Sequence, residues 1–287
     1  RGRNLSAFKR NLLFNRPTEP AEDVPSLELT VGIPRVLNMW EDYPFWCTLF
    51  TESGIRVLLS DPSTAELVVK GYQTVMSENI CFPAKITNGH IFNLMEKGVD
   101  RIFYPKVRYT RKEFSNTQNT YNCPVVTGYP QVIEAAIDPA GRNVAYDAPA
   151  FSFHDKRLLK KRCIEYLTGL GVSEAAAHGA FKKAQREMAR FREQVKQEGQ
   201  DIIQSAREAG RTVMLLVGRP YHIDPMIHMK IPEIVTAQGF DCITEDSVPS
   251  PVIARLPKVQ VLTQWGYPNR MFYAAHWAGS QPNVEVL

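Results

Sequence analysis

The chain has 287 residues, of which 44% are hydrophobic and 22% are charged, a composition typical of globular proteins. Its 34 basic and 30 acidic residues leave a net charge of +4, too balanced to indicate a nucleic-acid-binding protein. No apolar run approaches the roughly 20 residues of a membrane helix. Five cysteines without a CxxC pair argue against a secreted disulfide framework. We therefore expect a cytoplasmic protein that binds neither nucleic acid nor membrane.

The two ends of the sequence suggest part of a longer polypeptide. The chain begins at Arg1 without an initiator Met, and residues 283–287 have the pattern of a strand. Residues 1–14 have the apolar spacing of a short amphipathic helix, and the prolines that follow indicate a linker. We expect residues 1–29 to be a connector that docks on the main body.

From residue 30 onward, strand and helix patterns alternate. Strands are predicted at 31–38, 55–59 and 101–104, and helices at 43–53, 61–71 and 83–97. This order predicts a parallel sheet covered by helices, in which ligands bind outside the carboxyl ends of the strands. The polar stretch 105–122 is either a solvated surface connection or an anion-binding loop.

A long helical region separates this unit from a second one. Residues 154–209 are predicted to be helical, with a heptad-like apolar seam. A second α/β unit follows, with strands at 213–217 and 240–244 and a helix at 228–238. We therefore predict an α/β protein with two similar parallel-sheet, Rossmann-like domains. The divisions are 1–29 (helix and linker), 30–150 (first domain), 151–210 (helical connector) and 211–287 (second domain).

Two cysteine motifs carry the strongest chemical signal. Cys81 precedes Pro83 and Cys123 precedes Pro124, so each cysteine is expected just before a helix, where the positive end of the helix favours a thiolate. Two thiolates presented alike indicate iron–sulfur ligation, with the remaining ligands supplied from elsewhere. The alternative is a pair of inert buried cysteines. The other three cysteines lie in apolar patterns typical of a core.

Further candidate binding residues flank these motifs or follow the second unit's first strand. Lys85 lies one helical turn after Cys81 and is either a charge-screening residue or a solvated lysine. His90 is a lone histidine, packed or functional. The third motif, residues 218–225, is a stiff loop that would present Arg219, His222 and Asp224 to an anion or a partner. Its alternative is a rigid turn in which Arg219 pairs with Asp224, or with residues 245–246.

The segments SENICFPAK, NCPVV, GIPRVLNMWEDYPFW and VGRPYHIDP resemble the acyl-CoA dehydratase activase-related family. Its members are large bacterial proteins similar to 2-hydroxyacyl-CoA dehydratases and their ATP-dependent activators. The resemblance covers nearly all of residues 30–287. It implies a [4Fe–4S]-type cluster ligated by Cys81 and Cys123, an ATPase module upstream in the same polypeptide, and a further ligating cysteine after Leu287. The residues 86–88 depart from the family's usual Leu-Ala-His, which weakens a role for His90.

These observations lead to one preferred hypothesis and two alternatives. The preferred one is a dehydratase-like, cluster-binding region of an ATP-coupled low-potential electron-transfer protein, acting on an acyl-CoA or a redox partner protein. The first alternative is a non-catalytic scaffold that docks an acyl-CoA dehydratase or its activator and has structural cysteines. The second is a transferase with Cys81 as nucleophile and His90 as the only base nearby.

Overall fold

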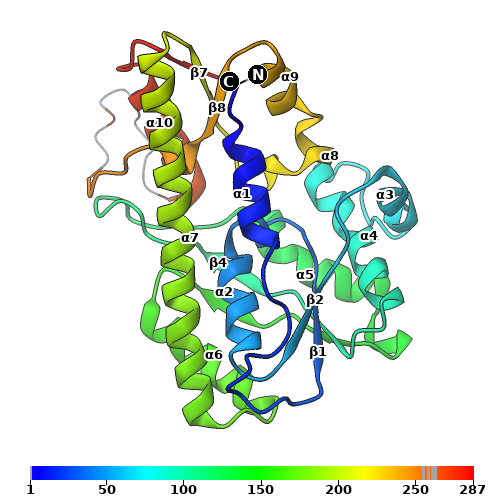
Figure 1. Ribbon diagram of the computed structural model, residues 1–287. Coiled ribbons are helices and arrows are strands. Elements are labelled where there is room, and N and C mark those ends of the chain that lie inside the picture. Colours follow the sequence, from blue (N-terminus) through cyan, green and yellow to red (C-terminus); the bar gives the residue numbers. More distant parts are fainter. Residues whose placement is uncertain (1, 254–255, 257–258, 260–263) are drawn as a thin grey trace.

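The computed structural model describes residues 2–253, 256, 259 and 264–287 and combines parallel β-sheets with α-helices (Figure 1). The coarse prediction of an α/β protein with parallel sheets is confirmed. No helix in the described part of the chain is both long and apolar enough to cross a bilayer.

The first sheet has the strand order β2-β1-β3-β5, and all of its neighbouring strands are parallel. Its strands are β1 (Thr30–Ile33), β2 (Arg56–Leu59), β3 (Arg101–Phe103) and β5 (Ala145–Asp147). The helices of this unit are α2 (Met39–Thr51), α3 (Ala65–Tyr72), α4 (Phe82–Glu96) and α5 (Pro124–Ile137). A short 3₁₀ turn, η1 (Ala140–Arg142), follows α5. Aromatic side chains fill the core: the ring of Trp46 contacts those of Phe103 and Phe151 at 5.0 and 4.8 Å.

The polar stretch 105–122 contains a strand that the sequence pattern did not predict. Strand β4 (Lys106–Tyr109) pairs in parallel with β6 (Ala150–Ser152). Only Val107 of β4 is buried, so the apolar signal of this strand rests on a single residue. Helix α2 also begins earlier than predicted, since residues 34–38 leave the strand and turn into the helix.

The second sheet has the order β8-β7-β9 and is also parallel. It consists of β7 (Val213–Leu216), β8 (Asp241–Thr244) and β9 (Val284–Val286). Its helical segments are η2 (Pro220–Ile223), α8 (Pro225–His228), α9 (Ile231–Ala237), η3 (Glu245–Ser247) and α10 (Gly266–Ala278). The single helix predicted at 228–238 is therefore wrong. Met229 and Lys230 have φ values of 49° and 63°, which interrupt right-handed helix, and Pro232 then fits the first turn of α9.

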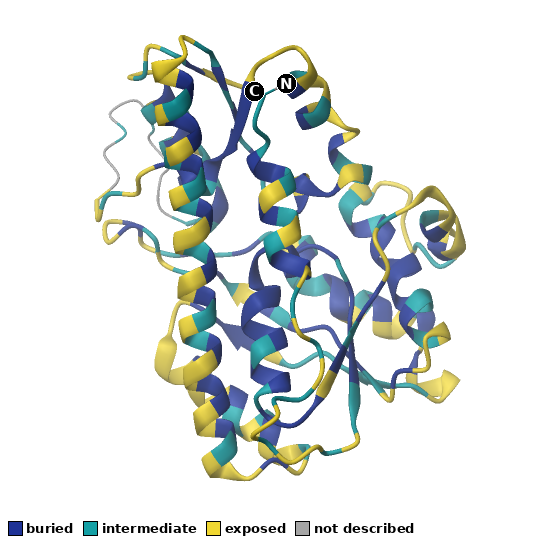
Figure 2. Cartoon of the chain, in the orientation of Figure 1, coloured by how far each residue is buried: buried dark blue, intermediate teal, exposed yellow. Residues whose placement is uncertain are grey.

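Helices α7 (Glu174–Glu208) and α1 (Leu5–Phe14) join the two larger sheets, because each contacts elements of both units. Helix α7 contacts α2 near one sheet and β7 and β8 of the other, and α6 (Lys156–Gly169) packs beside it. Helix α1 contacts α2, α7 and β8. Figure 2 shows a buried stripe along α7 opposite an exposed one. The predicted seam of α7 is buried, namely Phe181, Ala184, Met188, Phe191, Val195 and Ile202.

A buried ion network lies where these elements meet. The guanidinium of Arg270 in α10 forms ion pairs with Glu41 of α2 at 3.0 Å, Glu113 at 3.0 Å and Glu245 of η3 at 3.1 Å. Because these residues lie far apart in the sequence, the network holds α10 and η3 against α2. Buried charges persist only when they are paired, and Arg270 has three partners.

Candidate functional site

Cys81 and Cys123 occupy equivalent positions at the starts of two helices. Cys81 is the N-cap of α4 and Cys123 is the N-cap of α5; both have extended backbone conformations and are followed by a proline within two residues. Cys81 is exposed and Cys123 is half-buried, whereas the other three cysteines are buried. The placement before helix starts is confirmed, and both thiols are accessible enough to meet a ligand.

The helices that follow the two cysteines pack against each other. The hydroxyl of Tyr129 in α5 donates to Asn88 Oδ1 in α4 at 3.0 Å, which ties the two helices together. Burial raises the pKa of Tyr221 in η2 to about 12, and the thiols of Cys123 and Cys81 both add to this rise. Figure 1 shows α4 and α5 on the same side of the molecule.

A small apolar hollow of about 200 Å³ borders both motifs. Met76 and Ile80 line it from the segment before Cys81, and Val125 and Tyr129 line it from α5. The surface beside the cysteines is therefore largely apolar, which lowers the local dielectric around any bound charge.

His90 lies in a directed chain of hydrogen bonds that runs from the first unit to the second. Ser60 Oγ lies 2.7 Å from His90 Nδ1, Ser63 Oγ lies 3.0 Å from His90 Nε2, and Ser63 donates to Asp224 Oδ2 at 2.5 Å. Ser63 has one proton and gives it to Asp224, so it accepts from Nε2–H. Ser60 accepts from the backbone N–H of Arg35 at 2.8 Å and donates to Nδ1. These bonds assign the Nε2–H tautomer to His90.

This arrangement removes His90 as a base for Cys81. The ring is fully buried and both of its nitrogens are engaged by serines. Burial, reinforced by the Arg35 cation, lowers the pKa of His90 to about 3, so the ring is neutral at physiological pH. The transferase alternative therefore finds no base at this position.

Two residues before His90 have distinct roles: Gly89 allows close helix packing, and Lys85 lies near Cys81. A Cβ on Gly89 would lie 1.9 Å from the carbonyl oxygen of Leu67 in α3, so only glycine permits this approach of α3 and α4. Lys85 is half-buried in the first turn of α4, and its backbone N–H donates to Cys81 O at 3.2 Å. It therefore sits one turn from the candidate thiolate, as its spacing predicted.

The 218–225 loop directs Asp224 away from Arg219 and His222. Arg219 N–H donates to His222 Nδ1 at 3.2 Å, and the Arg219 guanidinium lies 6.0 Å from the ring centre of Tyr267. Asp224 is buried instead and accepts from Ser63 and from the backbone N–H of Met226 at 2.8 Å. In the described part of the chain no ion pair joins Arg219 to Asp224.

The other predicted partners of Arg219 are also engaged elsewhere. Glu245 pairs with Arg270 at 3.1 Å, and Asp246 pairs with Lys9 at 2.6 Å. Both ion-pair interpretations of the loop are therefore wrong. Asp224 bonds to Ser63 and Met226 instead, and cationic side chains from α10 and α1 reach Glu245 and Asp246.

The donor set for a metal is limited to the two cysteines. Over the described residues, no group of three or more His, Cys, Asp or Glu side chains is placed to hold a metal ion. Two thiols supply half of a four-cysteine set. The site as described therefore fits a cluster only with ligands from outside the described residues.

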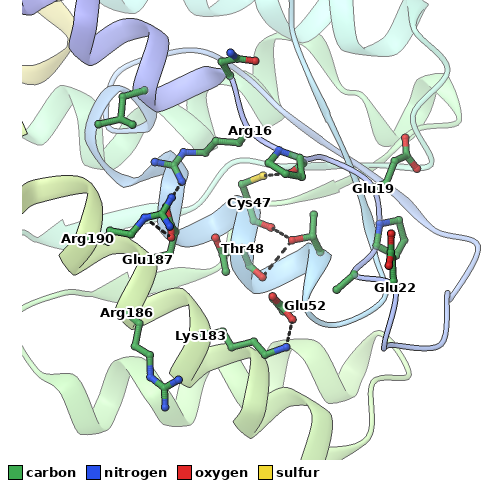
Figure 3. Close-up of a pocket in the computed structure, with 16 residues that line it drawn as sticks. Arg16, Glu19, Glu22, Cys47, Thr48, Glu52, Lys183, Arg186, Glu187 and Arg190 are labelled. Atoms are coloured by element: carbon green, nitrogen blue, oxygen red, sulfur yellow. Dashed lines mark hydrogen bonds and ion pairs between the residues drawn. The ribbon is translucent and has the colours of Figure 1, made fainter. Parts of the chain in front are cut away.

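A larger cavity lies elsewhere. It has a volume of about 740 Å³ and runs between the linker after α1, α2 and α7 (Figure 3). Several of its charged side chains pair with one another: Arg16 contacts Glu187 at 2.5 Å and Lys183 contacts Glu52 at 2.6 Å. None of the candidate residues lines it, and its compensated charges favour a role in packing the linker.

Three side chains of the site were not singled out in the sequence. Ser60 and Ser63 follow strand β2, and Tyr221 follows β7. The position of these residues just after parallel strands was the available signal, but serines and a tyrosine carry no motif of their own.

Comparisons with known proteins bear on the whole arrangement. A family model described as the CoA enzyme activase uncharacterised domain (DUF2229) matches residues 30–248, which include both cysteine motifs and the 218–225 loop. Searches of curated proteins and of solved structures found no match.

Proposed function

Because this chain belongs to the CoA enzyme activase uncharacterised domain family, related to acyl-CoA dehydratase activases, we propose that it is the dehydratase-like, iron–sulfur-cluster-binding region of an ATP-coupled, low-potential electron-transfer protein. The observation that carries this proposal is the matched placement of Cys81 and Cys123 at the starts of α4 and α5, with residues adjacent to both cysteines lining one apolar hollow.

The residues have distinct roles in this proposal. Cys81 and Cys123 ligate the cluster, and Lys85, one turn away, offsets its negative charge. Arg219, His222 and Asp224 belong to the loop that follows β7; Arg219 and His222 line a cavity of about 310 Å³, and Asp224 anchors the loop through Ser63. When bound, a cluster of this kind supplies one-electron transfer at a potential set by its charge, hydrogen bonds and exposure.

The proposal extends to the domain plan and the partners. In this proposal the two larger parallel sheets belong to two similar Rossmann-like domains, divided at 30–150 and 211–287, with 151–210 as connector and 1–29 as docking helix and linker. An ATPase module precedes the chain in the same polypeptide, and an acyl-CoA or a redox partner protein in the cytoplasm receives the electron. The remaining cluster ligands come from residues after Leu287.

Anaerobic reconstitution with iron and sulfide tests the ligand assignment. The measurement compares iron content, visible absorption and EPR signals for a chain continued past Leu287, its Cys81→Ala and Cys123→Ala variants, and a control, Cys163→Ala, in a buried cysteine. Loss of the cluster in the first two variants but not in the control is expected. A well-folded longer chain that takes up no iron would overturn the proposal.

One observation favours the second candidate, a docking scaffold. Large apolar side chains are exposed on α3 and on the segment leading to Cys81: Val69 is 71% exposed and Met76 is 68% exposed, with Tyr72 between them. Exposed apolar patches commonly mark protein interaction sites. In this reading, an acyl-CoA dehydratase or its activator docks here, and the cysteines serve packing.

Binding measurements separate the two candidates. For the scaffold, Val69→Lys and Met76→Lys should abolish binding to a purified dehydratase or activator, and Cys81→Ser should leave it unchanged. For the electron-transfer region, Cys81→Ser should remove the cluster signal whatever its effect on docking.

A further inference from the structure

A second cavity, of about 500 Å³, opens between α1, the loop after β1 and the start of α8. Arg10 and Phe14 line it from α1, Arg35 from the loop, and Ser63 and Asp224 from the relay described above. It adjoins the hydrogen-bond chain through Ser63 and is separate from the cavity in Figure 3.

Two cations of this cavity lack close anionic partners. Within the described ranges, neither Arg10 nor Arg35 forms an ion pair, and Arg10 Nη1 and Arg35 Nε are buried without any hydrogen-bond acceptor. Buried donors without partners are costly and uncommon in folded proteins. Arg16 also has a buried nitrogen without an acceptor, Nη2, but its guanidinium forms an ion pair with Glu187.

The nearest carboxylates are already engaged. Asp61 contacts Lys97 and accepts from Asn93 at 2.8 Å, and Asp224 accepts from Ser63 and from the backbone of Met226. They act on Arg35 only at longer range.

The ring of Phe14 holds the guanidinium of Arg35 in place. The guanidinium of Arg35 lies 4.7 Å from the ring centre of Phe14, a cation–π contact that orients the group. Arg10 lies one turn before Phe14 on α1, so the two residues share one face of that helix and both line the cavity. The positive charge is therefore preorganised, which reduces the entropy lost when an anion binds.

We propose that this cavity binds a phosphate group, with Arg10 and Arg35 as its anion-binding residues. Guanidinium groups match phosphate geometry through paired N–H donors. The amides of Asn11 and Asn15 also line the cavity, so the donors exceed what the two oxygens of a carboxylate accept, while a phosphate or pyrophosphate offers three or more. This site does not depend on whether Cys81 and Cys123 bind a cluster.

Calorimetric titration of the full 287-residue chain with inorganic pyrophosphate tests the site. Arg10→Gln and Arg35→Gln should each weaken binding about tenfold or more, the scale of a lost charge-assisted hydrogen bond. The matched control is Arg186→Gln, which removes an exposed arginine from the larger cavity and should bind like wild type. Absence of pyrophosphate binding to wild type, or wild-type affinity in both glutamine variants, overturns the proposal.

Chemical protection of the wild-type chain guards against misfolded variants. Pyrophosphate should slow phenylglyoxal modification of Arg10 and Arg35, mapped by peptide mass spectrometry, and leave that of Arg186 unchanged. Equal modification with and without pyrophosphate overturns the site.

Coenzyme A as a second titrant identifies the source of the phosphate. Tighter binding of coenzyme A than of pyrophosphate assigns the phosphate to a larger ligand; equal or weaker binding, lost in the same two variants, assigns it to free pyrophosphate or phosphate.

Discussion

His90 and Asp224, 134 positions apart in the chain, share the hydroxyl of Ser63: the imidazole donates to it at 3.0 Å and it donates to the carboxylate at 2.5 Å. One small side chain thus couples the Gly89-His90 motif of α4 to the loop that follows β7. Because all three groups are largely shielded from water, each depends on the others for its hydrogen bonds.

Ser63→Ala should therefore destabilise the protein out of proportion to its size. The change leaves His90 Nε2–H and Asp224 Oδ2 without their shared partner, at a cost of about 1–3 kcal/mol in the free energy of unfolding. Urea unfolding measures it. The control is Ser280→Ala, an exposed serine whose hydroxyl bonds only to its neighbours in sequence, the carbonyl of Trp277 and the amide of Gln281, and a change within about 0.5 kcal/mol is expected. Equal effects of the two changes would argue against a coupled chain.

Asp42 should make the stability of the protein fall as the pH rises. Burial, with a smaller contribution from Glu41, raises the pKa of Asp42 to about 8, against about 3.9 in an unfolded chain. Between these values the folded chain holds a proton that the unfolded chain has released, so the free energy of unfolding decreases as the pH increases.

Asp42→Asn should remove this decrease. The substitution should therefore raise the free energy of unfolding more at about pH 8 than at about pH 5, and the two effects should differ by more than about 1 kcal/mol. Urea unfolding at the two pH values gives the comparison. Asp201→Asn, on an exposed position of α7, should keep the wild-type difference. A variant of Asp42 with the wild-type pH dependence would contradict the assignment.

Arg270→Met should be among the most damaging substitutions in the chain. It leaves Glu41, Glu113 and Glu245 without their shared cation, and an unpaired buried charge costs about 3–5 kcal/mol. Thermal and urea unfolding report the loss. Arg56→Met, which breaks an exposed pair with Glu19, should cost no more than about 1 kcal/mol. Similar losses of stability in both variants would show that the burial of the Arg270 ion pairs does not determine the size of the effect.

Two glycines of α7 should respond oppositely to alanine. A Cβ on Gly199 would lie 2.3 Å from Ser247 Cβ, whereas a Cβ on Gly179 meets nothing within 4 Å. Gly179→Ala should stabilise the chain by about 0.5–1 kcal/mol through helix propensity. Gly199→Ala should destabilise it by about 1–3 kcal/mol, because the contact between α7 and η3 must open. Stabilisation by both changes, measured by urea unfolding, would show that η3 moves away from α7 without a cost in stability.

Local patterns were sufficient for much of the fold and for the candidate cysteines. The prolines after Cys81 and Cys123 place both residues before helices, and the apolar seam from Phe181 to Ile202 marks the buried face of α7. These features depend on short-range backbone preferences and on helical periodicity, which the sequence states directly. Strand β4 was missed because only Val107 of it is buried, and α8 and α9 were merged because two residues with positive φ carry no glycine signal.

The partners of buried polar groups were decided only by tertiary structure. The Arg219–Asp224 pairing expected from proximity in sequence does not form; Asp224 accepts instead from Ser63, 161 positions away, and Arg10 and Arg35 share one cavity although separate elements carry them. A hydrogen bond or an ion pair is set by where the chain brings two groups in space. The sequence by itself therefore determined the helix starts, the parallel α/β plan and the thiols, and the tertiary structure determined which charges are compensated and which are left available for a ligand.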